Sequence, residues 1–204
     1  MFNLPKSTEV RKQITKKLIY QKFSAELSGE KRKVFDDDIS KIVIINEISP
    51  VSVNIKEGEH VKSIFLVQIE LKNKKYIERN LVLISKLFGQ NLLMVLKYQE
   101  DYQFAIYQTK LLHSEWKKEE ECELNLVGLD LDAVWENLVS QVSGIIVQDG
   151  NTLDEQISYE SEKAKLKKQI EDLEKKARKE VQAKKKFEMH QRIKAYVKKL
   201  EEMR

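Results

Sequence analysis

The stretch VKSIFLVQIELK, residues 61–72, decides the fold, because it is strongly strand-like and its first half is apolar in both directions. Side chains alternate between two faces along a strand. One face takes Phe65, Val67 and Ile69, followed by Leu71, and the other face begins with Ile64. A strand that is apolar on both sides belongs in the middle of a sheet covered on both faces. We therefore expect Phe65, Val67 and Ile69 to be almost fully buried.

Patterns on both sides of this strand predict an α/β (α+β) domain over residues 1–148, with a mixed β-sheet flanked by helices. Apolar residues at four-residue spacing, from Val10 to Leu27, predict an N-terminal helix that starts near Ser7 or Thr8. The charge run 30–33 reads as a solvated segment. Asp36, Asp37 and Asp38 could bind a divalent ion, although acids directly before a strand more often keep a loop soluble. Further elements follow in order: strands at 41–50 and 51–55, a helix at 77–88 ended by Gly89, a hairpin of strands 91–98 and 102–109, and a helix capped by Asp130.

Residues 149–204 read as a long, charged helical tail of coiled-coil type. From Thr152 onward the chain has no Gly or Pro. Leu166, Ile170, Leu173 and Ala177 form one apolar seam, and Met189, Ile193, Tyr196, Leu200 and Met203 form another, out of phase with the first. This predicts either a stuttered helix or a helical pair. Because neither seam can be buried alone, the tail needs its own domain, a second copy or another protein as a partner.

Charge is unevenly distributed along the chain. Of 37 basic and 33 acidic residues, 16 and 11 lie from Asn151 onward, a net charge of +5 there and of −1 (21 against 22) before it. The single cysteine, Cys122, excludes an internal disulfide and a cysteine-based metal cluster. No apolar run has the length of a signal peptide or of a membrane span, so we expect a cytoplasmic protein without membrane contact.

The polar end of the central stretch carries the pair Glu70-x-Lys72, with both side chains on one face of a strand that precedes a helix. Restriction-type nucleases of the PD-(D/E)xK class use this arrangement: carboxylates bind Mg²⁺, and the lysine orients a water molecule. That class also has an acid on the preceding strand. The predicted strand 51–55 offers only Asn54, with Glu57 at its turn. Glu70, Lys72 and Glu57 are thus candidate catalytic residues under a nuclease hypothesis, and a solvated strand end is the simpler interpretation.

The sequence gives little support for other kinds of catalytic or binding site. The three histidines are scattered and the six glycines are isolated, so we expect no zinc site, phosphate loop or bound cofactor. The run 175–186 could contact nucleic-acid phosphates through seven basic residues, although no aromatic residue is interleaved with them. These residues are Lys175, Lys176, Arg178, Lys179, Lys184, Lys185 and Lys186. A solvated helix surface explains the same run.

Several segments together resemble a family of uncharacterised bacterial proteins, the domain-of-unknown-function family four-three-nine-one. They are MFNLPKSTEV, IVIINEISP, VKSIFLVQIELK, YQTKLLHSEW and LDLDAVWENLV. The likeness covers about residues 1–145, with the tail as a variable extension. It implies an association with helicase and DNA-methyltransferase genes of restriction or phage-defence loci, and it brings no catalytic residues.

These observations lead to two hypotheses from different classes. The first is a non-enzymatic accessory or scaffolding subunit of a restriction or phage-defence complex, which docks a helicase or DNA methyltransferase, or a second copy of itself, through residues 152–204. The second is a metal-dependent nuclease, active or degenerate, that uses Glu70 and Lys72 with Mg²⁺.

Overall fold

The structure is a computed structural model that describes residues 2–89, 91–148 and 150–203. The chain divides into two units, Met1–Ile146 and Val147–Arg204. In the described parts of the chain, no helix combines the length and the hydropathy that a membrane span requires.

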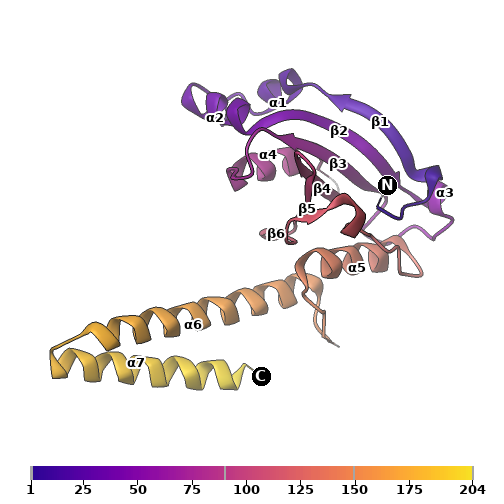
Figure 1. The fold of residues 1–204 in the computed structure, drawn as a ribbon. Helices are drawn as coiled ribbons and strands as arrows, with labels where there is room; N and C mark the ends of the chain where they lie inside the picture. Colours follow the sequence, from indigo (N-terminus) through magenta and orange to yellow (C-terminus); the bar gives the residue numbers. More distant parts are fainter. Residues whose placement is uncertain (1, 90, 149, 204) are drawn as a thin grey trace. The chain divides into compact units, whose positions relative to one another are not determined.

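Within its described residues, the first unit contains a single seven-stranded mixed sheet (Figure 1). Its strands are β1 (Glu9–Ile14), β2 (Ile39–Ile48), β3 (Ile64–Leu71), β4 (Asn91–Tyr98), β5 (Asp101–Tyr107), β6 (Leu111–His113) and β7 (Lys117–Lys118). They lie in the order β1-β2-β3-β4-β5-β6, and β7 also pairs with β5. Only β3 and β4 are parallel, and α4 (Glu78–Phe88) connects them. The predicted α+β class with a mixed sheet is confirmed.

The central strand β3 pairs with β2 on one side and with β4 on the other. Val67 and Ile69 are fully buried on one face, and Ile64 and Leu66 are fully buried on the other. The prediction for Phe65 is wrong: its ring is only half-buried and lies 6.0 Å from the ring of Phe88. Phe88 is the last residue of α4, so the helical cover ends where β3 begins.

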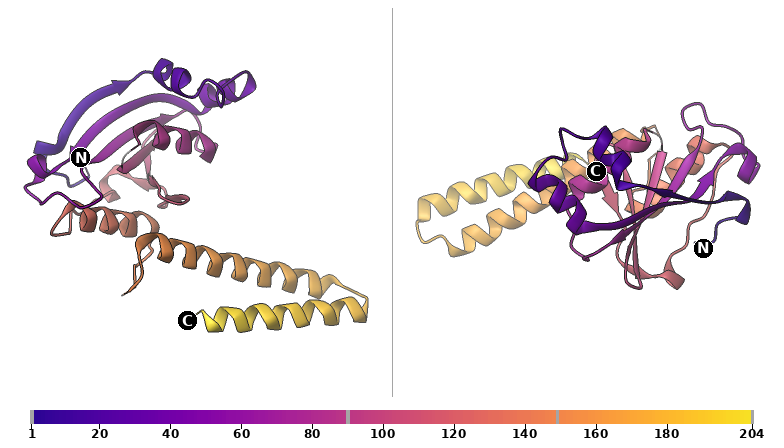
Figure 2. Two further views of the ribbon diagram at one scale, coloured as in Figure 1. Left: turned by 180° about the vertical axis from the view of Figure 1, so that it is seen from behind. Right: turned by 90° about the horizontal axis from the view of Figure 1, so that it is seen from above.

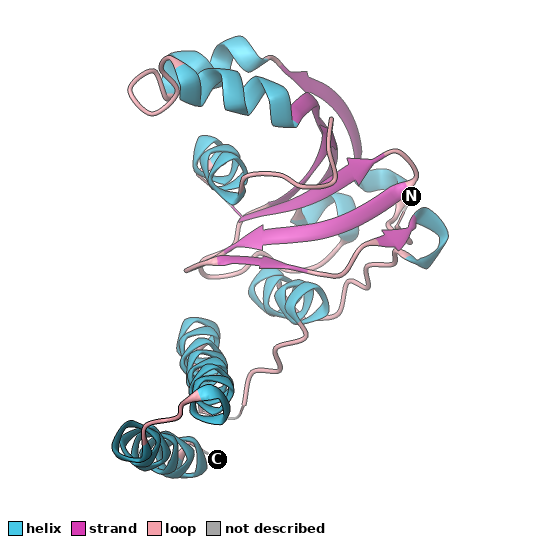
Figure 3. Ribbon diagram, turned by 60° about the vertical axis from the view of Figure 1, so that its left-hand side comes forward, coloured by secondary structure: helices cyan, strands magenta, loops and turns pink. Residues whose placement is uncertain are grey.

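Three helices cover the face of the sheet that carries Val67 and Ile69 (Figure 3). They are α1 (Lys16–Lys22), α2 (Glu30–Asp38) and α4. Ile19, Phe35 and Ile84, one from each helix, are fully buried in a core that includes Val67 and Ile69 of β3. This core explains why a stretch as charged as 30–38 is helical, because Phe35 anchors it to the sheet. The prediction of a solvated loop there is corrected.

Helix α5 (Leu131–Ser143) packs against β5 and β6 on the opposite face. As predicted, the Asp130 side chain caps it by accepting a hydrogen bond of 2.9 Å from the backbone N–H of Ala133. The ring of Phe2 packs edge-on against Tyr102 and Phe104 of β5. On β1, by contrast, Glu9, Arg11 and Gln13 are exposed, so this face is open beside the first strands.

The predicted N-terminal helix is wrong. A short 3-10 helix η1 (Lys6–Thr8) leads into β1, and the α-helix starts only at Lys16. Val10 and Ile14 share a face in both cases, because a spacing of four residues repeats in a strand as well as in a helix. Pairing with β2 decides for the strand.

The predicted strand 51–55 is also wrong, because the segment forms the short helix α3 (Pro50–Val53). Ser49 and Ser52 cap it reciprocally: the Ser49 side chain accepts from the Ser52 backbone N–H, and the Ser52 side chain accepts from the Ser49 backbone N–H. Pro50 occupies the first helical position, which favours a helix start. Asn54 closes the turn in a left-handed conformation, with φ of 53°.

The second unit is an antiparallel pair of helices, α6 (Leu153–Lys179) and α7 (Ala183–Glu202), which lie side by side in every view (Figure 2). Of the two predicted alternatives, the structure has the helical pair. The break falls at Glu180, whose backbone is extended, between the two out-of-phase seams. Lys199 of α7 bridges to Glu162 of α6 at 2.6 Å and joins the helices at their open end.

We expect Ile69→Ala to lower the free energy of unfolding of the first unit by about 2–5 kcal/mol, because it leaves a cavity at a fully buried site. Phe65→Ala should cost less, since that ring keeps contact with solvent. Denaturant titration followed by tryptophan fluorescence reports on this unit alone, because Trp116 and Trp135 both belong to it. An Ile69→Ala midpoint equal to that of the wild type would contradict the central position of β3.

Candidate functional site

The open part of the sheet forms a hollow of about 370 Å³ on the outer face of β1, β2 and β3. It contains cationic, anionic, amide and apolar side chains: Glu9, Arg11, Gln13, Lys41, Val43, Ile45, Asn46, Gln68 and Glu70. Val43 and Ile45 are half-buried. The charged side chains come from β1, from the start of β2 and from the end of β3, which pair with each other. Of the three predicted catalytic residues, only Glu70 lines this hollow.

Strand register determines which groups surround Glu70. It pairs with Lys41 of β2 and with Lys97 of β4. Directly paired residues of neighbouring strands project from the same face. The half-buried Glu70 carboxylate therefore lies between two lysines, and the Gln68 side-chain amide is 3.5 Å from it.

The Glu70 carboxylate also affects the pKa of Lys97 on the neighbouring strand β4. The Tyr102 side chain has the largest influence on the pKa of Lys97 and raises it, against the opposing effect of burial. The carboxylates of Glu70 and Glu119 raise the pKa of Lys97 further. Lys97 also lies 5.3 Å from the centre of the Tyr102 ring. This arrangement favours the charged form of Lys97.

Lys72 and Glu57 lie outside the hollow. Lys72 follows the last residue of β3, is exposed, and donates its backbone N–H to the carbonyl of Asp38 at 2.8 Å. Glu57 pairs with Lys62 at 3.4 Å, in the loop between α3 and β3. The structure therefore does not gather Glu70, Lys72 and Glu57 around one cavity.

Two of the acids that precede β2, Asp36 and Asp38, have structural partners. Asp38 is buried and accepts hydrogen bonds from the backbone N–H of Ile77 at 2.8 Å and from Asn80 at 2.7 Å, at the start of α4. Asp36 accepts from Lys16 at 2.9 Å and from the Tyr20 hydroxyl. Among the residues that the structure describes, no three or more Asp, Glu, His or Cys side chains are grouped so that they could hold a metal ion.

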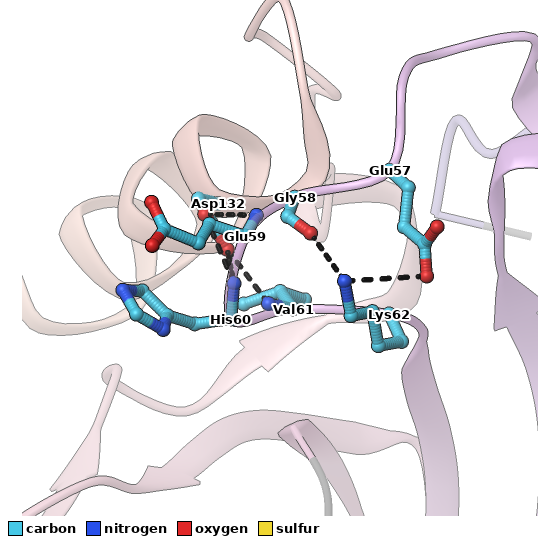
Figure 4. Close-up of polar contacts among 7 residues, drawn as sticks. All are labelled: Glu57, Gly58, Glu59, His60, Val61, Lys62 and Asp132. Carbon is cyan, nitrogen blue, oxygen red and sulfur yellow. Dashed lines mark hydrogen bonds and ion pairs between the residues drawn. The ribbon is translucent and has the colours of Figure 1, made fainter.

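The loop that carries Glu57 is anchored to α5 by Asp132 (Figure 4). The Asp132 carboxylate accepts from three successive backbone N–H groups, of Glu59 at 2.7 Å, His60 at 3.2 Å and Val61 at 2.7 Å. Burial acts to raise the pKa of Asp132, but these N–H groups outweigh it and lower the pKa. Gly58 is required beside them, because a Cβ there would lie 2.4 Å from an oxygen of Asp132.

The seven basic residues predicted for nucleic-acid contact surround the turn between α6 and α7. Four precede it at the end of α6, and three follow it in the first turns of α7. Lys175 and Arg178 are 4.0 Å from Glu171 and Glu174 in the same helix. For the other five, the described residues provide no ion pair within 4.0 Å.

The comparison with known families decides the identity of the chain. Residues 2–200 match the family described as Domain of unknown function (DUF4391). The chain belongs to this family. No curated protein and no solved structure matches the chain. The match is longer than the expected likeness over about residues 1–145, because it includes α6 and α7 as far as residue 200.

Sequence reasoning missed the groups around Glu70 in this DUF4391 protein, namely Arg11, Lys41 and Lys97. Arg11 was assigned to a helix, and the partners of Glu70 depend on pairing between strands that lie up to 29 residues apart (70 − 41). Alternation along β2 and β4 gave no clear signal, because it places Lys41 on a face with Val43 and Ile45, and Lys97 on a face with Leu93 and Val95. Their register with β3 could not be read from it.

We expect Asp132→Asn to destabilise the first unit at pH 7, because the amide binds the three N–H groups less strongly than a carboxylate does. The pKa of Asp132 is lowered by folding, so its contribution is complete above the unfolded value of about 3.9 and is lost as the pH falls through the folded value. Denaturant midpoints from pH 7 to pH 2 should therefore converge for wild type and variant at low pH. Asp37→Asn is the control and should stay close to wild type at pH 7. A difference independent of pH would contradict the role of the charge.

Proposed function

We propose that this DUF4391 protein is a non-enzymatic accessory or scaffolding subunit of a restriction or phage-defence complex in the bacterial cytoplasm, and that it docks its partner through α6 and α7. One observation carries the proposal: the two helices cover their apolar seams incompletely. No described residue of α7 is buried. Seven seam residues are half-buried: Ile170, Leu173, Met189, Ile193, Tyr196, Leu200 and Met203.

The energetics of helices in proteins support a partner for this seam. A helix in a protein gains most of its stability from packing of its apolar face rather than from intrinsic propensity. In α6, Leu166 and Ala177 are buried, while the seam of α7 remains half-exposed along its length. A further helix packed against this seam would complete its burial, in the way that third and fourth helices complete a bundle.

The partner class follows from the family resemblance rather than from the coordinates. A helicase or DNA methyltransferase of the same locus is the proposed partner, and self-association through residues 152–204 is the alternative. The tail has a net charge of +5 from Asn151 onward. Like charge disfavours a close pair of identical tails and favours a partner with an acidic helix.

Catalysis at Glu70 has weaker support. Mg²⁺ sites in nucleases rely on several oxygen ligands, mostly carboxylates. Glu70 is flanked by Lys41 and Lys97 instead, and neither Glu57 nor Lys72 lines its hollow. The accessory role therefore includes no metal or cofactor, and the nuclease with Mg²⁺ is the competing hypothesis.

We expect Leu173→Asp combined with Leu200→Asp to abolish capture of the coexpressed methyltransferase or helicase, because a partner would have to bury two carboxylates. Tryptophan fluorescence should show an intact first unit, and circular dichroism should show that the tail is still helical. Ala164→Asp with Ala195→Asp is the matched control, since both alanines are exposed on the same helices. Capture that persists in the Leu variant would contradict docking through the seam, and a dimer of the isolated wild type in light scattering would favour self-association.

We expect the purified wild type not to nick supercoiled DNA in the presence of Mg²⁺ or Mn²⁺, and Glu70→Gln to behave identically. The Glu70 carboxylate has lysines rather than carboxylates as its paired neighbours, so it should hold a divalent ion weakly. Agarose-gel assays over a range of metal concentrations provide the measurement. Metal-dependent cleavage that disappears in Glu70→Gln would establish the nuclease hypothesis instead.

A further inference from the structure

The turn between α6 and α7 concentrates positive charge at one end of the second unit. Residues 175–186 contain seven basic side chains and one acid, Glu180. Because α6 ends at Lys179 and α7 begins at Ala183, the fold brings the basic ends of both helices together. We call the seven residues that were predicted for nucleic-acid contact the basic end.

Part of this charge is placed where it destabilises the unit. Lys184, Lys185 and Lys186 occupy the first turns of α7, where the helix dipole disfavours cations. That helix has no acid in its first turn and no side-chain cap, whereas α6 begins with Asp154 and Glu155. Nothing described in α7 is buried to offset the repulsion. A purely structural role gives no reason for three lysines at this position.

Cations from both helices also converge on a concave site. A hollow of about 270 Å³ lies between α6 and α7 and is lined by Glu174, Ala177, Arg178, Lys186, His190 and Ile193. The small side chain of Ala177 continues a seam of larger residues and leaves this space open. Concave surfaces lined by one sign of charge focus the potential and attract counter-ions. Glu174, which lies 4.0 Å from Arg178, neutralises only part of this charge.

The chemistry of the basic end favours nucleic acid over an acidic protein surface. Protein interfaces have a core depleted in charge and especially in lysine. Interfaces with nucleic acid are polar and strongly positive, and lysine or arginine contacts to phosphates supply most sequence-independent affinity. Around the turn, the strongly exposed apolar side chains are Val181 and Phe187, with 93% and 63% exposure. Two isolated apolar residues among seven cations do not form the core of a protein interface.

We infer that the basic end binds the phosphodiester backbone of nucleic acid without sequence preference, through Lys184, Lys185 and Lys186 together with Arg178 and Lys179. The inference is independent of the docking role, because it uses the charged end of the helical pair rather than the seam at Leu173 and Leu200. A subunit of this kind could hold DNA and a protein partner at the same time.

Fluorescence anisotropy of the full-length protein with a labelled 20-base-pair duplex and with the matching single strand tests the inference. We expect the triple variant Lys184→Gln, Lys185→Gln, Lys186→Gln to bind at least about tenfold more weakly at 0.1 M salt. Its plot of log K against log salt should be shallower by about 2 to 3, since each lost phosphate contact contributes about 0.9 for a duplex. The matched control is Lys165→Gln, Lys167→Gln, Lys168→Gln, which removes three exposed lysines of α6 away from the turn and should bind like wild type.

Three results would overturn the inference: no binding by the wild type at 0.05 M salt, equal losses in the two triple variants, or polyglutamate competing as well as unlabelled duplex at equal charge. The last result would assign the basic end to an acidic protein partner. Circular dichroism of both variants shows whether α7 remains helical. Because the three lysines oppose the helix dipole, their replacement should preserve or raise helicity, so a loss of binding is not explained by unfolding.

Discussion

Burial of β3 on both faces is the constraint on which the first unit depends. Val67 and Ile69 need the core formed with α1, α2 and α4, while Ile64 and Leu66 need cover on the opposite face. A strand with both faces covered lies inside the sheet, and β3 accordingly pairs with β2 on one side and with β4 on the other. The parallel partner β4 in turn requires a crossover, which α4 supplies. The acids before β2 serve this arrangement as well, because Asp38 ties the start of α4 to the end of α2.

Incomplete cover of the outer face creates the candidate site in the first unit. Helix α5 lies on β5 and β6, and the N-terminal Phe2 packs on β5, so Glu9, Arg11 and Gln13 of β1 meet solvent. The charged side chains there alternate in sign along the Lys41–Glu70–Lys97 row. In this row Glu70 has lysines as its paired neighbours, unlike the clustered carboxylates that hold a metal ion. The hollow thus presents cationic, anionic and amide side chains together.

In the second unit the apolar seam and the basic residues occupy different places, although both come from the same stretch of sequence. Its seam is apolar but only half-covered, and its turn is basic and largely without counter-charges. Packing and phosphate binding make different demands, because the first needs a dry surface and the second needs hydrated cations. In the antiparallel pair the seam runs along the helices and the cations lie at one end. The DUF4391 match, over residues 2–200, includes α6 and α7 as far as residue 200.

The sequence by itself determined the elements whose signals are local. The two-sided apolar pattern identified β3, and Gly89 and Asp130 marked helix ends. The out-of-phase seams predicted either a stutter or a break, and the structure has the break, at Glu180. Tertiary structure decided what depends on pairing between distant residues. The four-residue spacing of Val10 and Ile14 suits both a helix and a strand, and only pairing with β2 selected the strand. The neighbours of Glu70 likewise follow from register, since a one-residue slip would turn Lys41 and Lys97 to the other face.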